Sequence, residues 1–315
     1  MIIDRLIDRI LELDNPSVVG LDTRMEYVPK YLKEEAQKKQ KEPLRAASDA
    51  VYAFNAAIID SVCDVVPAVK PQIAFYEQYG AAGIDCYIKT VRYAKSKGLF
   101  VIGDIKRGDV ASTAQAYANA HLGRVTGADG NDYAVFDEDF VTLNPYLGFD
   151  AVSPFIEEAR KHDKGLFILV KTSNAGSGDI QDVQTEMGMV YEAVAKKVMS
   201  WGKNDIGCHG FSMVGAVVGA THPAQASELR KMMPSAFFLV PGYGTQGGTA
   251  GDAGVCFNEN GIGAIVNNSS AILAAHMKPE NRGEFGESNF ALAARKAALE
   301  MRDSLRKHIP RAKGK

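Results

Sequence analysis

Hydrophobic positions along the chain follow two alternating spacings, and each spacing predicts a different kind of element. Near the N-terminus apolar residues recur every three or four positions, which predicts an amphipathic helix over residues 2–13. Short apolar runs then alternate with helical patterns. The predicted strands cover residues 17–23, 65–75, 99–102, 140–146, 166–173, 211–220, 236–243 and 264–268. Further helices are predicted over residues 51–62, 77–96, 184–201, 223–232 and 289–307, with another that ends near residue 162.

The alternation of strands and helices predicts an α/β protein with a parallel sheet. Eight such units in one chain favour a closed (β/α)8 TIM barrel over an open sheet. Residues 25–47 are rich in Lys, Glu and Gln, so we expect a charged, largely helical insertion after the first strand. No repeat, low-complexity tract or Pro-rich linker marks a boundary, and residues 1–315 are therefore expected to form a single domain.

Composition and charge narrow the range of partners and compartments. With a net charge of −2 the chain has no basic surplus that would favour nucleic acid or a membrane surface. Only residues 306–315 are clearly basic, and they are expected to form a solvated chain end. The four cysteines show no C-x-x-C spacing, and no signal peptide or membrane-length apolar run is visible. These features predict a soluble, cytoplasmic protein with reduced thiols.

A cluster of charges follows the apolar run at residues 99–102. In an extended strand Asp104 and Lys106 would share one face, because side chains two residues apart point the same way. Residues 112–115 fit an S-x-x-Q capping box, which would start a helix there and leave Asp109 in the connecting loop. Charges at the end of a buried strand are costly unless they pair or do chemistry. The pattern alone is compatible with a structural ion pair and with a catalytic group.

Polar side chains recur at the predicted C-terminal ends of the strands. They are Asp22, Lys70, Asp104, Lys106, Asn144, Thr172 and Ser173. In a barrel these ends meet at one face, where the βα loops build the active site. The shared position of the seven residues favours a functional site over scattered structural polar groups.

A glycine-rich segment, PGYGTQGG at residues 241–248, follows the seventh strand, and residues 267–270 follow the eighth. Loops at these two places often bind phosphate through backbone N–H groups. The segment also matches a G-x-G-x-x-G dinucleotide fingerprint. That motif belongs in the first βα unit with an acid about 20 residues later, and neither condition holds here, so phosphate is the favoured ligand.

The six histidines form no H-x-x-x-H pair, and no metal site is predicted from their spacing.

Asp104-x-Lys106-x-x-Asp109 resembles the D-x-K-x-x-D motif of orotidine 5′-phosphate decarboxylases and related barrels. Companion segments strengthen the resemblance and point to the longer-chain bacterial branch of the family. They are Leu21-Asp22, Lys70-Pro71-Gln72, Phe75-Tyr76-Glu77, T-L-N-P-Y-L-G at residues 142–148, K-T-S-N at residues 171–174 and P-G-Y-G-T-Q-G-G at residues 241–248. The resemblance extends over residues 18–273, which is most of the chain.

The resemblance implies a homodimeric lyase that converts orotidine 5′-phosphate (OMP) to UMP and CO₂ without a cofactor, in de novo pyrimidine biosynthesis. It implies a charge network of Lys70, Asp104, Lys106 and Asp109, in which Lys106 is the proton donor and Asp109 reaches the partner's site. Asp22 would hold the ribose, together with Thr113 of the other chain. Ser173 and Gln246 would contact the pyrimidine and bridge it to the phosphate. The remaining substrate-binding residues implied are Asn144, Pro241, Gly247, Gly248, Ser269 and Ser270.

Two positions depart from the family pattern. Ser270 stands where the family usually carries an Arg that clamps the phosphate, and Arg282 is the nearest Arg downstream. Ala175 stands where a Pro is expected. Neither departure touches the four charged residues, so we expect the chemistry to be kept with weaker substrate binding.

Two alternatives remain beside the decarboxylase. One is a metal-assisted sugar-phosphate lyase on the same barrel, because such enzymes share the D-x-K-x-x-D triplet. The other is a phosphate-ligand binding protein of reduced activity, suggested by Ser270 in place of Arg. The intact set of Lys70, Asp104, Lys106 and Asp109 argues against the second.

Overall fold

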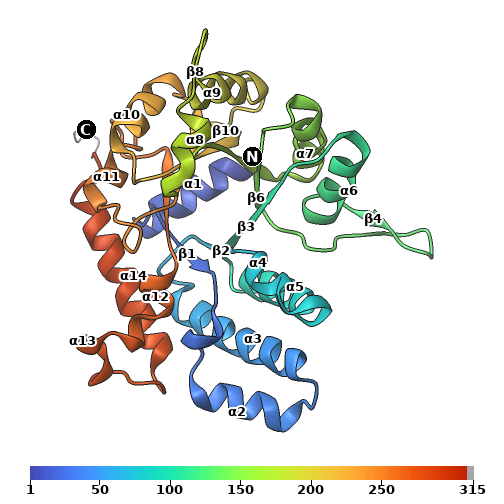
Figure 1. Cartoon of the computed structure of the whole chain (residues 1–315), viewed down its shortest axis with the longest axis vertical. Coiled ribbons are helices and arrows are strands. Elements are labelled where there is room, and N and C mark those ends of the chain that lie inside the picture. The colour runs from blue at the N-terminus through green and yellow to red at the C-terminus, as the bar shows by residue number, and fades with distance from the viewer. Residues whose placement is uncertain (311–315) are drawn as a thin grey trace.

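The structure, a computed structural model, describes residues 1–310 and shows a closed barrel of eight parallel strands (Figure 1). In order around the barrel the strands are β1 (Ser17–Leu21), β12 (Ala264–Asn268), β11 (Ala236–Val240), β10 (Ser212–Val218), β7 (Gly165–Lys171), β6 (Phe140–Leu143), β3 (Phe100–Arg107) and β2 (Ala68–Pro71). The predicted (β/α)8 TIM barrel is thus confirmed. Of the predicted basic end, residues 311–315 lie outside the described part of the chain.

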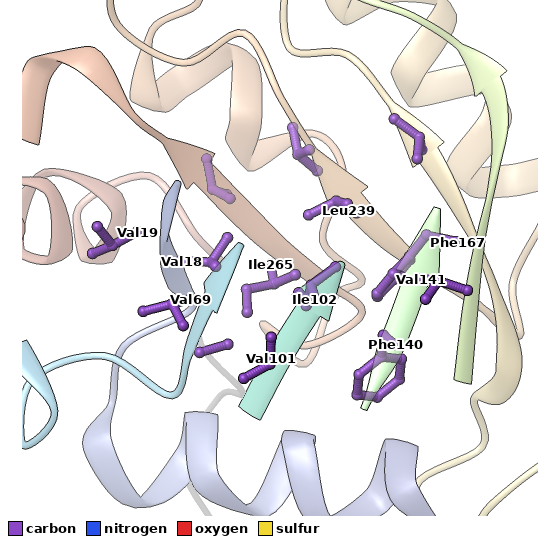
Figure 2. Close-up of a cluster of buried hydrophobic side chains, with 14 of the residues drawn as sticks. Val18, Val19, Val69, Val101, Ile102, Phe140, Val141, Phe167, Leu239 and Ile265 are labelled. Atoms are coloured by element: carbon purple, nitrogen blue, oxygen red, sulfur yellow. The ribbon is translucent and has the colours of Figure 1, made fainter. Parts of the chain in front are cut away.

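The strands form a core that is apolar on both faces. Every residue of β1, β2, β6, β10, β11 and β12 is buried, as expected where helices cover the outside of a barrel. Figure 2 shows side chains from neighbouring strands packed together, among them Val18, Val101, Phe140 and Ile265. Phe140 and Phe167 contact each other with ring centres 5.4 Å apart. This core fixes the strand ends that carry the polar side chains.

Helix α1 (Ile2–Leu13) covers the N-terminal ends of the strands. The backbone N–H of Ile2 donates to Asp163 just before β7, and Asp4 accepts from the backbone of His209 just before β10. Its apolar face, including Leu6 and Ile7, is fully buried. The helix therefore closes the end of the barrel opposite the predicted site.

The segment after β1 is the predicted helical insertion. It contains a 3-10 turn, η1 (Met25–Tyr27), and helix α2 (Lys30–Lys39), which packs on the outer side of α3 (Pro43–Val62) (Figure 1). Only Ala36 of α2 is buried, because the helix covers another helix and not the barrel itself.

The remaining helices surround the barrel or extend its loops. They are α4 (Ala74–Glu77), α5 (Gly80–Ser96), α6 (Ala111–His121), α7 (Phe149–His162), η2 (Ala175–Ser177), α8 (Gly178–Gln181), α9 (Val190–Trp201), α10 (Pro223–Met232), α11 (Ala250–Gly254), α12 (Ser270–Leu273), η3 (Ala275–Met277), α13 (Pro279–Arg282) and α14 (Phe290–Arg306). Within residues 1–310 none of the helices combines the length and apolar character needed to cross a membrane.

Several predicted boundaries were wrong. The strand predicted over residues 65–75 is only Ala68–Pro71, because Pro71 lacks a backbone N–H and the chain turns into α4. The helix predicted over residues 184–201 begins at Val190. A two-stranded hairpin of β8 (Gln184–Thr185) and β9 (Gly188–Met189) precedes it, with Gly188 at a φ of 105° that favours glycine.

A second hairpin, β4 (Val125–Thr126) with β5 (Asp132–Tyr133), extends from the loop before β6 and has no counterpart in the predicted elements. The capping box predicted over residues 112–115 is also wrong. Helix α6 begins at Ala111 and its N-terminus has no side-chain cap. Asp109 nevertheless lies in the connecting loop, as expected.

Candidate active site

A cavity of about 670 Å³ opens at the C-terminal ends of the barrel strands. Its volume is within the range of small-molecule sites. Nine of the predicted site residues line it: Asp22, Lys70, Asp104, Lys106, Ser173, Pro241, Gln246, Ser269 and Ser270. These residues come from the ends of β1, β2, β3, β7, β11 and β12. Of the seven polar residues expected at the strand ends, all but Asn144 line this cavity, since Thr172 does so as well.

Asp104 is the centre of a buried charge network. Its Oδ2 atom is 2.7 Å from Lys70 Nζ, and its Oδ1 atom is 2.6 Å from Lys106 Nζ. Lys70 also lies 3.9 Å from Asp22 Oδ1. The register of neighbouring strands brings these groups together. Gly20 of β1 lies opposite Lys70 of β2, and a backbone β-bridge joins Gln72, just after β2, to Asp104 of β3. The site thus holds alternating negative and positive side chains.

The charges of the lysine and aspartate side chains determine which form of each group is present. Burial opposes ionisation of Asp104, but the charges of Lys70 and Lys106 outweigh burial and hold the pKa of that carboxyl far below its ordinary value. Burial likewise opposes the ammonium form of Lys70, yet Asp104 and Asp22 raise its pKa. Asp104 is therefore a carboxylate and Lys70 an ammonium at neutral pH.

The backbone of β3 sets the position of Lys106. The pairing of β3 with β6 shifts register between Gly103 and Arg107, and Lys106 has a φ of 46°. A non-glycine residue in this left-handed region costs about 1–3 kcal/mol and is kept where the surrounding structure holds it. Here Lys106 N–H donates to Thr142 Oγ1 at 3.0 Å. The Lys106 side chain is 44% exposed and so remains accessible from the cavity.

Two residues that hold Asp104 were missed in the sequence. Thr142 Oγ1 donates to Asp104 Oδ1 at 2.9 Å, and the Gln72 side-chain amide donates to Oδ2 at 3.1 Å. With the two lysines, these bonds give the carboxylate four donors. Thr142 lies two residues before the predicted Asn144, and its position at the end of a strand was the signal that could have identified it.

Two oxygen atoms in the cavity are buried without a hydrogen-bond partner. They are Asp22 Oδ1 and Asn267 Oδ1. A buried acceptor without a donor costs about 1–3 kcal/mol. Both atoms belong to residues that line the cavity, and both are themselves shielded from solvent.

The glycine-rich segment forms a compact loop beside the N-terminus of α12. The backbone N–H groups of Gly247 and Gly248 donate within the loop, to Gly244 O at 2.8 Å and Gly242 O at 3.0 Å. Neither glycine lines the cavity. The Oγ atoms of Thr245 and Ser270 are 2.7 Å apart and join this loop to the one after β12.

Besides Gly247 and Gly248, three predicted residues lie outside the cavity of the single chain. Asp109 Oδ1 accepts from the N–H of Val110 at 2.7 Å in the loop after β3. Thr113 is exposed on α6, and exposed Asn144 accepts from the N–H of Tyr146 at 3.0 Å. The structure does not bring these three side chains to the Lys70–Asp104–Lys106 network within one subunit.

The cavity also contains residues to which the sequence analysis assigned no role. They include Arg24, Tyr27, Phe75, Asn174, Gln181, Tyr243 and Thr245. Tyr27 lies in the insertion after β1, which composition marked only as charged surface, and Arg24 immediately precedes that insertion. Gln181 is in α8, and its amide pairs in both directions with Thr172, at 2.9 and 2.7 Å.

Within residues 1–310, no three His, Cys, Asp or Glu side chains are grouped so as to hold a metal ion. The charged lining of the cavity is instead made of lysine, arginine and aspartate side chains.

Comparison with known proteins places this chain beside one family. Residues 18–284 match the family described as "Orotidine 5'-phosphate decarboxylase / HUMPS family". The orotidine 5′-phosphate decarboxylase of Clostridium perfringens is 42% identical over 310 residues, which cover 98% of this chain and 99% of the relative. The corresponding protein of Clostridium acetobutylicum is 44% identical over 310 residues, covering 98% of this chain and 100% of the relative. The solved structure of Leishmania donovani OMP decarboxylase aligns with a TM-score of 0.69 and 27% identity, over 96% of this chain and 99% of that chain.

Proposed function

The chain belongs to the orotidine 5′-phosphate decarboxylase / HUMPS family and is a carboxy-lyase that converts OMP to UMP and CO₂, and we propose that Lys70, Asp104 and Lys106 carry out this reaction. The observation that carries the proposal is the buried carboxylate of Asp104 held between two ammonium groups in the cavity, at 2.7 and 2.6 Å. The proposal assigns a separate role to each group.

Lys106 stabilises the charge that develops on the substrate. When the bond between C6 and the carboxylate breaks, its electron pair remains on C6 in the plane of the ring, where no adjacent carbonyl can delocalise it. A cation fixed beside C6 lowers the energy of this carbanion, because it is in place before the charge forms. Lys106 Nζ then gives a proton to C6, and the product is UMP.

Asp104 raises the energy of the bound substrate carboxylate. Two like charges 4 Å apart repel by about 4 kcal/mol at an effective dielectric constant of 20. The repulsion disappears as neutral CO₂ leaves. Lys70 keeps Asp104 ionised and in position through their 2.7 Å contact, so that the carboxylate does not take up a proton when the substrate arrives.

Other cavity residues bind the nucleotide around this centre. The Asp22 carboxylate, which is partly exposed at the cavity, accepts from a ribose hydroxyl. Ser173 and Gln246 contact the pyrimidine, and Gln246 extends toward the phosphate. The phosphate lies against Pro241, Ser269 and Ser270, with Gly247 and Gly248 shaping the loop that covers it. Asn144 supports the neighbouring loop.

The working unit is a homodimer of single-domain chains covering residues 1–315, with Asp109 and Thr113 reaching the partner's site. The loops after β3 and β6 touch, since a Cβ atom on Gly108 would lie 2.8 Å from Asn144 O. These loops expose large apolar side chains, with Val110 53% and Tyr146 80% exposed. A second copy of the chain that covers this patch would bring Asp109 toward the other subunit's network.

Decarboxylation of OMP by the purified protein should be unchanged by a chelator. The reaction is followed by the loss of OMP absorbance and by CO₂ release, with and without EDTA. Equal rates are expected because the cation at the reacting carbon is Lys106. Loss of activity with EDTA and recovery with Mg²⁺ would instead identify a metal-assisted sugar-phosphate lyase. Binding of UMP without any turnover of OMP would identify a binding protein.

A further inference from the structure

We infer that Arg24 is the side chain that recognises the substrate's phosphate. The inference rests on the proposed function, because it assigns the phosphate end of the same nucleotide site. Five charged residues line the cavity: Asp22, Arg24, Lys70, Asp104 and Lys106. Lys70 and Lys106 are both committed to Asp104, at 2.7 and 2.6 Å. Among the described residues of the lining, Arg24 is the remaining cation.

The existing contacts of Arg24 leave its guanidinium available to a ligand. Its carboxylate partner is Glu26, at 3.6 Å, and both side chains are more than half exposed. An exposed ion pair of this kind contributes about 0–1 kcal/mol. The guanidinium carbon also lies 6.0 Å from the ring centres of Tyr27 and Phe75, and both rings line the cavity. The rings hold the guanidinium at the cavity without using its N–H donors.

The topology places Arg24 beside the loop that follows β12. β1 pairs directly with β12, with Val19 opposite Asn268. Arg24 follows the end of β1 by three residues, and Ser269 and Ser270 follow β12. Strand β1 and the segment after β12 are in close contact, since a Cβ atom on Gly20 would lie only 1.9 Å from Ser269 Oγ. Arg24, Ser269 and Ser270 all line the cavity, and the Arg24 guanidinium lies near Phe75 on the β2 side of β1. A phosphate bound between the guanidinium and the serine hydroxyls would contact both.

The chemistry of the ligand fits this position. A phosphate monoester carries close to two negative charges at neutral pH, while Ser269 and Ser270 supply only neutral groups. Arg binds phosphate through two parallel N–H···O bonds, which a serine hydroxyl cannot provide. Arg282 does not take this role in the structure, because it is exposed, lies outside the cavity and donates from Nε to Met277 O at 3.0 Å.

The test compares ligands with and without the phosphate. Arg24→Ala should weaken binding of UMP and lower kcat/KM for OMP by between about tenfold and about a hundredfold, the effect of losing a charge-assisted contact. Binding of uridine and turnover of orotidine should change less than about twofold. Arg24→Lys should fall between the wild type and Arg24→Ala, and Arg282→Ala should match the wild type. Calorimetry measures binding, and an absorbance assay measures turnover.

A second substitution places a new guanidinium at Ser270, which lines the same cavity as Arg24. Ser270→Arg should raise kcat/KM for OMP, with a larger gain in the Arg24→Ala background than in the wild type. Such non-additivity is expected of two groups that bind one phosphate. Equal losses for UMP and uridine in Arg24→Ala, or unchanged UMP binding, would overturn the inference. Should the wild type fail to decarboxylate OMP, the proposed function fails, and the comparison of UMP with uridine still decides the role of Arg24.

Discussion

Lys106→Ala should abolish decarboxylation of OMP while leaving the affinity for UMP nearly unchanged. In the proposed mechanism the variant removes both the cation beside C6 and the proton donor. A preorganised charge and a positioned general acid each contribute about 10²-fold or more, so kcat should fall by roughly 10⁴-fold at least. UMP binding should survive because the proposed phosphate and ribose contacts lie elsewhere in the cavity. Steady-state kinetics and calorimetry with UMP give the two quantities.

The matched control for this variant is Lys161→Ala. Lys161 also forms an ion pair at 2.7 Å, with Glu158, but it lies on α7 away from the cavity. This control should keep wild-type kcat and KM. Substantial turnover by Lys106→Ala would remove the assignment of Lys106 as the proton donor, and a parallel loss in Lys161→Ala would indicate a general effect on the fold.

Mixing two inactive variants should restore activity if Asp109 works across a dimer. A Lys106→Ala chain and an Asp109→Ala chain are each expected to be inactive alone. In their heterodimer one site lacks both groups, while the other has Lys106 from one chain and Asp109 from its partner. Random pairing gives about half heterodimers and therefore about a quarter of the wild-type sites. Activity is measured after subunit exchange has reached equilibrium.

Exchange itself is verified by mass spectrometry of chains that carry different tags. A mixture of Lys106→Ala with Lys70→Ala provides the control, because both residues lie within one cavity and no heterodimer site would contain both. This control should stay inactive. A proven heterodimer of Lys106→Ala and Asp109→Ala that also stays inactive would show that Asp109 acts within its own chain.

The barrel and the Asp104 network were predictable because both follow from the local spacing of apolar and charged residues along the chain. Alternating apolar segments fix the strand and helix order, and a parallel barrel brings strand ends to one face. Lys70, Asp104 and Lys106 then meet because they lie at the ends of adjacent strands. The i, i+2 spacing put Asp104 and Lys106 together, although their contact also involves a register shift and the left-handed backbone of Lys106.

The loop residues of the site were not predictable in the same way. Arg24 and Tyr27 reach the cavity from a segment whose composition is typical of exposed surface, and only the three-dimensional course of that loop shows it. Asn144 was expected in the site because it ends a strand, but in the single chain it lies outside the cavity and accepts from the N–H of Tyr146, whereas Thr142 donates to Asp104. The polar group that faces the cavity thus lies two residues earlier in the chain than the one that the strand-end pattern selected.

The central claim is that the site stabilises a carbanion at C6 of the pyrimidine through Lys106. The most direct test needs no decarboxylation, because the proton that Lys106 delivers to C6 can also be removed by the reverse step. UMP is incubated with the protein in D₂O, and the C5 and C6 proton signals are followed by NMR. The account predicts exchange at C6 with the C5 proton retained, at a rate that collapses in Lys106→Ala. Exchange at C5, or equal C6 exchange by the wild type and Lys106→Ala, would contradict it.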